Sequence, residues 1–127
     1  MIDHVSIAVR DIGAARTFYI AILAPLGLSE LVVRPTQIGF GKTYPEIWIN
    51  LRATVRNDDD PGSHVALRAR SADAVRSFHR AAMDVGARDD GPPGPRSYGS
   101  GPNGYYAAFV RDLDGNRIEA VTFIAST

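Results

Sequence analysis

The sequence contains no cysteine, which excludes disulfide bonds and thiolate metal ligands. It also contains no apolar run near the roughly 20 residues that a membrane-spanning helix needs, so we expect no contact with a membrane. Neither sign of charge is in excess, because 14 basic residues balance 14 acidic ones. Nucleic-acid partners favour a basic excess, so we expect no nucleic-acid binding. Because cysteine is missing, any transition-metal site must use histidine and carboxylate ligands.

The start of the sequence lacks the basic segment followed by an apolar run that marks a secretory signal. Together with the missing cysteines, this predicts a cytoplasmic protein. The length of 127 residues predicts one domain over 1–127. The hydrophobic fraction of 45% and the charged fraction of 22% are typical of a globular protein.

Hydrophobic periodicity predicts a mixture of strands and two helices. Alternating apolar residues predict a strand over 2–9, and helical spacing predicts a helix that follows Asp11 and ends at Pro25 and Gly27. Three more strands are predicted before an acidic, turn-rich connector, at 28–34, 36–41 and 46–52. The second half is predicted to contain, in order, strand 63–70, helix 71–86, strand 87–90, a Gly- and Pro-rich surface loop over 91–104, and strands 105–112 and 116–123.

The two halves of the chain repeat each other at an offset of sixty residues. The stretch HVSIAV begins at His4 and the stretch HVALRA begins at His64, so two of the three histidines open matching strands. The register continues into the helices, where Phe18 matches Phe78. This repeat predicts two modules of one strand, one helix and three strands, over about 1–56 and 63–124, packed about a symmetry axis.

Paired βαβββ modules, a histidine at the start of each, and the stretch FVRDLDGNRIEAV at 109–121 resemble the vicinal oxygen chelate superfamily. Its members include glyoxalase I, extradiol dioxygenases, methylmalonyl-CoA epimerase and the bleomycin and fosfomycin resistance proteins. The resemblance covers nearly the whole chain. It implies an α+β fold in which two βαβββ modules form curved mixed sheets around a central groove, with the helices outside. It also implies a homodimer, since many relatives are dimers.

Side-chain alternation places His4, His64 and Glu119 on the faces of their strands that point away from the helices. Two imidazoles and one carboxylate suit a divalent ion such as Zn, Fe(II), Mn, Ni or Co, and leave coordination positions open for a substrate. The resemblance implies that these three residues are the metal ligands and that Glu119 is also catalytic. It further implies a small-molecule substrate with vicinal oxygens.

Whether the metal has a fourth protein ligand stays open. Glyoxalase-like relatives carry a carboxylate on the last strand of the first module, where Glu46 is the sole candidate, although Trp48 and Asn50 align there as well. Phe109 occupies the position, ten residues before the final glutamate, at which extradiol dioxygenases have a tyrosine, and this disfavours ring cleavage. The predicted substrate-binding residues are Trp48, Asn50, Arg68, Tyr98 and Phe109. The alternatives are that Trp48 and Phe109 belong to the core and that Arg68 is an exposed strand-end residue.

The leading hypothesis is a divalent-metal-dependent enzyme, either a glyoxalase-like lyase or isomerase or a dioxygenase. The alternative is a metal-free small-molecule-binding protein of the bleomycin-resistance kind, whose groove holds its ligand without chemistry. A third hypothesis is a relative that has lost its activity and serves as a sensor or partner domain. The two histidines and Glu119 favour the enzyme, because a binding protein has no need of three ligands. The substrate and the metal stay open.

Overall fold

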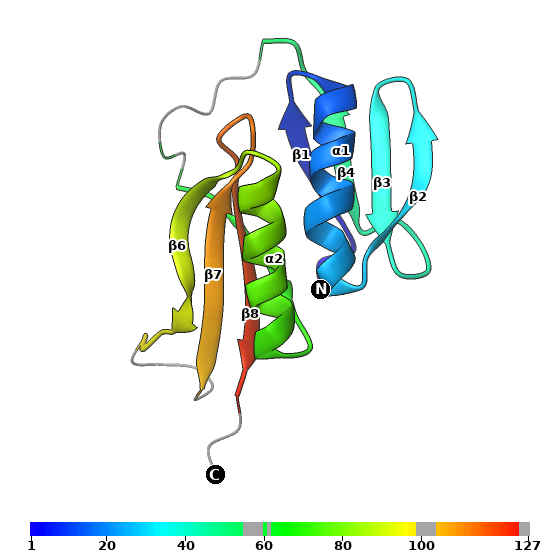
Figure 1. The fold of residues 1–127 in the computed structure, drawn as a ribbon. Helices are drawn as coiled ribbons and strands as arrows, with labels where there is room; N and C mark the ends of the chain where they lie inside the picture. The colour runs from blue at the N-terminus through cyan, green and yellow to red at the C-terminus, as the bar shows by residue number, and fades with distance from the viewer. Residues whose placement is uncertain (55–59, 61, 99–103, 125–127) are drawn as a thin grey trace.

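The computed structural model describes residues 1–54, 60, 62–98 and 104–124. Within these residues, two α-helices and eight strands follow one another in the order that the repeat predicts, with one short 3-10 helix after the first α-helix (Figure 1). The elements are β1 Val5–Val9, α1 Ile12–Leu23, the 3-10 helix η1 Ala24–Leu26, β2 Ser29–Arg34, β3 Gln37–Gly41, β4 Ile47–Leu51, β5 Val65–Arg68, α2 Ala72–Asp84, β6 Arg88–Pro95, β7 Tyr105–Arg111 and β8 Arg117–Phe123.

Each half of the chain forms its own four-stranded mixed sheet. The first has the order β1-β4-β3-β2 and the second the order β5-β8-β7-β6. The pairs β1–β4 and β5–β8 are parallel, and the remaining neighbouring strands are antiparallel. The prediction of an α+β fold built from two βαβββ modules is therefore confirmed. Module one below means β1 to β4 with α1, and module two means β5 to β8 with α2.

Local sequence signals set the ends of both helices. The side chain of Asp11 accepts a hydrogen bond from the Ala14 amide at 3.0 Å, and Ser71 caps α2 in the same way. Gly27 ends η1 with a φ of 78°, a left-handed conformation that glycine adopts without strain. The predicted stop at Pro25 and Gly27 is thus confirmed, after one 3-10 turn.

The core lies between the helices and one face of each sheet. Ile7 and Val9 on β1 and Ile118 and Ala120 on β8 are buried there, as alternation predicts. The helices α1 and α2 pack against each other and against their own sheets. In Figure 1 both helices lie in front, and the two sheets stand side by side behind them. The opposite, helix-distant face of each sheet carries the site residues discussed below.

The expected surface loop over 91–104 is wrong in its first part, because β6 continues to Pro95. This strand pairs only with β7, so it is an edge strand, where a proline without an N–H is tolerated. The pairing shifts register between Gly91 and Gly94, which accommodates the two prolines between them. Residues 99–103 of the expected loop lie outside the described residues.

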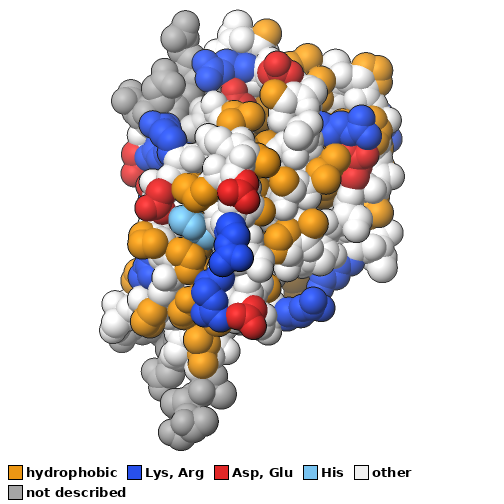
Figure 2. Space-filling view, in the orientation of Figure 1, with side chains coloured by type: hydrophobic (Ala, Val, Ile, Leu, Met, Phe, Trp, Pro, Cys, Tyr) orange, Lys and Arg blue, Asp and Glu red, His pale blue; other side chains and the backbone are white. Residues whose placement is uncertain are grey.

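The surface agrees with the balanced composition. Figure 2 shows basic and acidic side chains interspersed over the helical face. In the described ranges, no helix is both long and apolar enough to cross a membrane.

Candidate functional site

A buried carboxylate marks the helix-distant face of module two. Glu119 on β8 is 1% exposed, and its neighbour across the parallel β5–β8 pair is Ala66. His64 comes immediately before β5, and its Nε2 lies 3.0 Å from Glu119 Oε1. Tyr105 on β7 donates its hydroxyl to Glu119 Oε2. Each carboxylate oxygen therefore has its own partner, a histidine on one side and a phenol on the other.

The side chains of His64 and Glu119 differ sharply in solvent exposure. The side chain of His64 is 43% exposed, whereas that of Glu119 is 2% exposed. Burial, and then the bond to Glu119, raise the pKa of the Tyr105 phenol, so the phenol stays a neutral donor at physiological pH. The result is an accessible imidazole backed by a buried carboxylate, an arrangement suited to metal binding or to proton exchange.

Aromatic rings surround the carboxylate. Phe109 on β7 lies beside the glutamate in the β7–β8 register, and its ring centroid is 6.2 Å from that of His64. The ring of Tyr105 makes edge contacts with Tyr98, at a centroid distance of 4.8 Å, and with Phe123, at 5.4 Å. Two predicted substrate-binding residues, Tyr98 and Phe109, thus lie next to the partners of Glu119. The rings form an apolar wall that is suited to an apolar or aromatic ligand.

Arg68, another predicted substrate-binding residue, reaches the same face. Its guanidinium lies over the ring of Phe123, 4.7 Å from the centroid. Within the described part of the chain it has no acidic partner. Arg96 differs, because it donates to three backbone carbonyls of β6 and stabilises that strand. Among the described residues, Arg68 is therefore a cation on this face that has no acidic partner and is free to meet an anionic group.

His4, the remaining predicted ligand, does not join this group within one chain. Its Nδ1 lies 2.8 Å from Asp3 Oδ1, and Asp3 also accepts a hydrogen bond from the Tyr44 hydroxyl at 3.0 Å. The hydrogen bond with His4 holds the pKa of Asp3 below its usual range. In the described ranges, no three His, Cys, Asp or Glu side chains are placed together to hold a metal ion.

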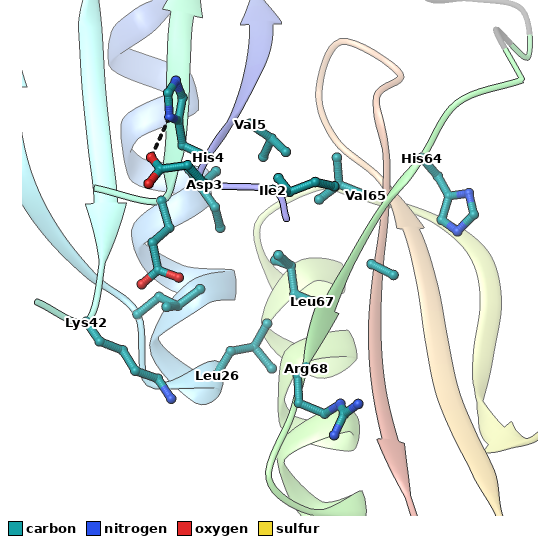
Figure 3. A pocket seen from close by; sticks show the side chains of 14 residues that line it. Ile2, Asp3, His4, Val5, Leu26, Lys42, His64, Val65, Leu67 and Arg68 are labelled. Atoms are coloured by element: carbon teal, nitrogen blue, oxygen red, sulfur yellow. Dashed lines mark hydrogen bonds and ion pairs between the residues drawn. The ribbon is translucent and has the colours of Figure 1, made fainter. Parts of the chain in front are cut away.

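A groove of about 460 Å³ separates the two histidines, and it is called the inter-module groove below. It lies between β1 and β5 and is lined by apolar side chains of both modules, among them Ile2, Val5, Leu26, Val65 and Leu67. Figure 3 shows His4 on the side of module one and His64 on the side of module two, with its ring turned away from His4. Lys42 and Arg68 lie at one end of the groove (Figure 3).

Register identifies the residue of module one that corresponds to Glu119. Ser6 lies beside Trp48 in the β1–β4 pair, as Ala66 lies beside Glu119 in the β5–β8 pair. Trp48 therefore occupies the equivalent position, and the guanidinium of Arg34 lies 5.4 Å from its ring centroid.

The other two candidates on this strand are placed differently. Asn50 is 7% exposed, and its Oδ1 accepts a hydrogen bond from Gln37 Nε2 at 2.7 Å. Glu46 lies just before β4 and lines the inter-module groove. Trp48, and not a carboxylate, therefore occupies the register position at which the resemblance stated above implies a fourth ligand.

A second buried polar group joins the two modules, and the sequence interpretation missed it. Asp112, 4% exposed, accepts a hydrogen bond from the Tyr19 hydroxyl of α1 at 2.5 Å and another from Asn116 Nδ2 at 2.9 Å. Asn116 Nδ2 also donates to the Ala8 carbonyl of β1 at 2.8 Å. Burial raises the pKa of Asp112, and the same cause raises the pKa of Tyr19. These residues, called the clasp below, tie the β7–β8 turn to module one.

Comparisons with known proteins bear on this geometry. The model of the Glyoxalase/Bleomycin resistance protein/Dioxygenase superfamily matches residues 1–120. A glyoxalase/bleomycin resistance protein from Albidiferax ferrireducens is similar in structure, with 28% identity, a TM-score of 0.82, and coverage of 94% of this chain and 96% of that chain.

Two further solved structures share the fold at lower identity. A family enzyme from Burkholderia phytofirmans is 18% identical with a TM-score of 0.70, covering 97% of this chain and 98% of that one. A variant of the fosfomycin resistance protein FosX from Listeria monocytogenes, in complex with Mn(II) and 1S,2S-dihydroxypropylphosphonic acid, is 17% identical with a TM-score of 0.69, covering 94% and 87%. No curated protein matches the chain.

Proposed function

The chain belongs to the Glyoxalase/Bleomycin resistance protein/Dioxygenase superfamily, and on this premise we propose that it is a divalent-metal-dependent enzyme whose site is completed by a second copy of the chain. The observation that carries the proposal is the buried Glu119 carboxylate, paired with the accessible imidazole of His64. A buried carboxylate is costly unless its partners compensate it, and such groups cluster at functional sites.

The donor set of one chain fits a metal ion only in part. The imidazole of His64 and the carboxylate of Glu119 lie together and are ligands that suit Mn, Fe(II), Co, Ni or Zn. Two donors are fewer than the three protein ligands that are usual for a catalytic ion. His4 is the third donor by resemblance, and within one chain it is bonded to Asp3 instead. The site therefore requires a rearrangement or a second chain.

A second chain is the simpler solution. The two sheets stand side by side, so within one chain their helix-distant faces do not cover each other (Figure 1). A twofold-related copy would lay the face of its module one, with His4, Trp48 and Asn50, over module two of the first chain. Ile2, which is 80% exposed at the inter-module groove, would gain burial in such a dimer. Each of the two equivalent sites would then contain residues of both chains.

In this proposal the residues of module two bind and orient the substrate. A bound divalent ion would supply Lewis acidity to a substrate with vicinal oxygens. Phe109 and Tyr98 would exclude water from one side, and Arg68 would bind an anionic group. Phe109 has no hydroxyl to offer beside Glu119, which favours lyase or isomerase chemistry over oxygenation. The Mn(II) complex of the FosX variant, whose ligand carries two hydroxyl groups, makes Mn²⁺ the first metal to test.

The test is the metal content and Mn²⁺ affinity of protein purified without a chelating tag. We expect one ion per chain in the wild type, and a loss of at least about tenfold in affinity for each of His4→Ala, His64→Ala and Glu119→Gln. His79→Ala is the matched control, because His79 is the third histidine and is bonded to Asp89, away from Glu119. A His4→Ala variant that binds Mn²⁺ as tightly as the wild type would remove His4 from the site. Sedimentation of the same samples measures whether the wild type is a dimer.

A metal-free binding protein is the second candidate, and two observations favour it. Both oxygens of Glu119 already have partners within the chain, and Trp48 replaces a carboxylate at the equivalent position of module one. The rings near Glu119 would then hold an aromatic ligand without chemistry. A wild type that binds no Mn²⁺ but binds an aromatic ligand in equilibrium dialysis would decide for this candidate.

A further inference from the structure

The carboxylate of Glu119 presents its two oxygens to different neighbours. Oε1 is 3.0 Å from His64 Nε2, and Oε2 accepts the hydrogen bond of the Tyr105 hydroxyl. Because the side chain is almost fully buried, no bulk water can take the place of either partner. The orientation of the carboxylate is therefore set by these two contacts, one from the residue that precedes β5 and one from β7.

Tyr105 is itself held in place from two sides. Its ring makes edge contacts with Tyr98 and Phe123, and in the β7–β8 register it lies beside Phe123. A ring fixed in this way presents its hydroxyl at a fixed position, so it can act as a rigid donor. His64 is less constrained, because it precedes β5 and is 43% exposed. Of the two partners of Glu119, Tyr105 is therefore the one that fixes the orientation of the carboxylate more firmly.

We propose that Tyr105 is a positioning residue, which reserves Oε2 of Glu119 and leaves Oε1, beside His64 Nε2, as the oxygen available to a metal ion. This inference rests on the proposed function, since it concerns the same site. A carboxylate that offers one oxygen occupies one coordination position, which leaves more positions open for a substrate. Hydrogen-bonded partners of metal ligands orient those ligands, and their loss commonly weakens metal binding.

The neighbouring tyrosine provides a matched control. Tyr106 follows Tyr105 on β7 and points to the opposite face, where its hydroxyl accepts a hydrogen bond from Arg76 of α2 at 3.1 Å. Tyr105→Phe and Tyr106→Phe each remove one hydroxyl from adjacent positions of the same strand. A general effect of weakening β7 would appear in both variants, whereas an effect transmitted through Glu119 would appear only in Tyr105→Phe.

The experiment is a Mn²⁺ titration of the full-length chain, followed by electron paramagnetic resonance of the free ion. Tyr105→Phe is expected to bind Mn²⁺ about 10- to 100-fold more weakly than the wild type, and Tyr106→Phe within about twofold of it. An unchanged affinity in Tyr105→Phe would overturn the inference. Equal losses in the two variants would also overturn it, because they would point to the stability of the strand.

A second measurement separates this inference from the proposed function. If the wild type binds no Mn²⁺, the metal-dependent function fails, and crystal structures of metal-free wild type and Tyr105→Phe decide the role of Tyr105. Positioning requires that Glu119 Oε1 stays within hydrogen-bond distance of His64 Nε2 in the wild type and moves out of it in the variant. A Tyr105→Phe structure with the His64–Glu119 contact intact would contradict the role.

Discussion

Removing the Tyr19 hydroxyl tests the clasp that joins the two modules. Tyr19 is 1% exposed, and its hydroxyl donates to the buried carboxylate of Asp112 at 2.5 Å. In Tyr19→Phe the ring keeps its contacts with Phe18 and Phe40, so the change is confined to one hydrogen bond. Hydrogen bonds to charged groups contribute about 1.5–3 kcal/mol. Asp112 Oδ2 keeps the hydrogen bond from Asn116, so we expect the free energy of unfolding to fall by about 2 kcal/mol.

The assay is equilibrium unfolding in urea at pH 7 and at a fixed protein concentration, because a dimer makes the midpoint depend on concentration. With a urea dependence of about 2 kcal/mol per molar, the midpoint of Tyr19→Phe should fall by about 1 M. Tyr106→Phe, which removes a hydroxyl near the surface, should shift it by less than about 0.3 M. A Tyr19→Phe midpoint within that smaller range would refute the idea that the clasp stabilises the fold.

Two further predictions concern the turn before β7 and the link between α2 and β6. Gly104 has a φ of 76°, and an added Cβ would lie 1.9 Å from the Ile124 carbonyl oxygen, so Gly104→Ala should cost at least about 3 kcal/mol in a urea titration. Gly62→Ala, with a similar φ of 80° and open space around the Cβ, should cost only about 1–2 kcal/mol, and equal losses would contradict the role of the clash. The hydrogen bond from His79, and then one from the Gly91 amide, lower the pKa of Asp89, so this link stabilises the fold above the ordinary pKa of 3.8 and the stabilisation is lost as pH falls below it. The urea midpoints of wild type and His79→Ala should therefore differ at pH 6 and approach each other towards pH 3, and a difference that grows on acidification would contradict this interpretation.

Most of the fold could be predicted from the repeat and from the alternation of apolar residues. The first strand reads as an alternating stretch from Val5 to Val9, and the matched helices begin directly after their caps Asp11 and Ser71. These signals are local, so they can be read from sequence. The strand predicted over 87–90 was too short, because the prolines and glycines that continue β6 to Pro95 are typical of loops, while the place of β6 at a sheet edge depends on the tertiary structure.

The candidate site was accessible to sequence reasoning only within one module. Parity placed His64 and Glu119 on one face, and the two side chains are in contact. The sequence of a strand does not determine how the two modules are placed relative to each other, so the distance of His4 from this pair could not be predicted. Tyr105 was missed for a similar reason, because its contact with Glu119 follows from the β7–β8 register rather than from a motif.

The clasp illustrates a different limit. The stretch DLDGN forms the turn between β7 and β8. Its carboxylates are buried because module one supplies donors to them, with Tyr19 of α1 bonded to Asp112 and Arg10, which follows β1, bonded to Asp114. Composition favours exposure for aspartate, and only the packing of the two modules reverses that expectation.

The claim that one site is shared between two chains is tested most directly by mixing two defective variants. Chains carrying His4→Ala are coexpressed with chains carrying Glu119→Gln, and Mn²⁺ bound to the mixture is measured against each variant alone. In random dimers about half are mixed, and each mixed dimer has one intact site, so the mixture should recover about a quarter of the wild-type capacity. A mixture that binds no more Mn²⁺ than the average of its two parents would contradict a site built from two chains.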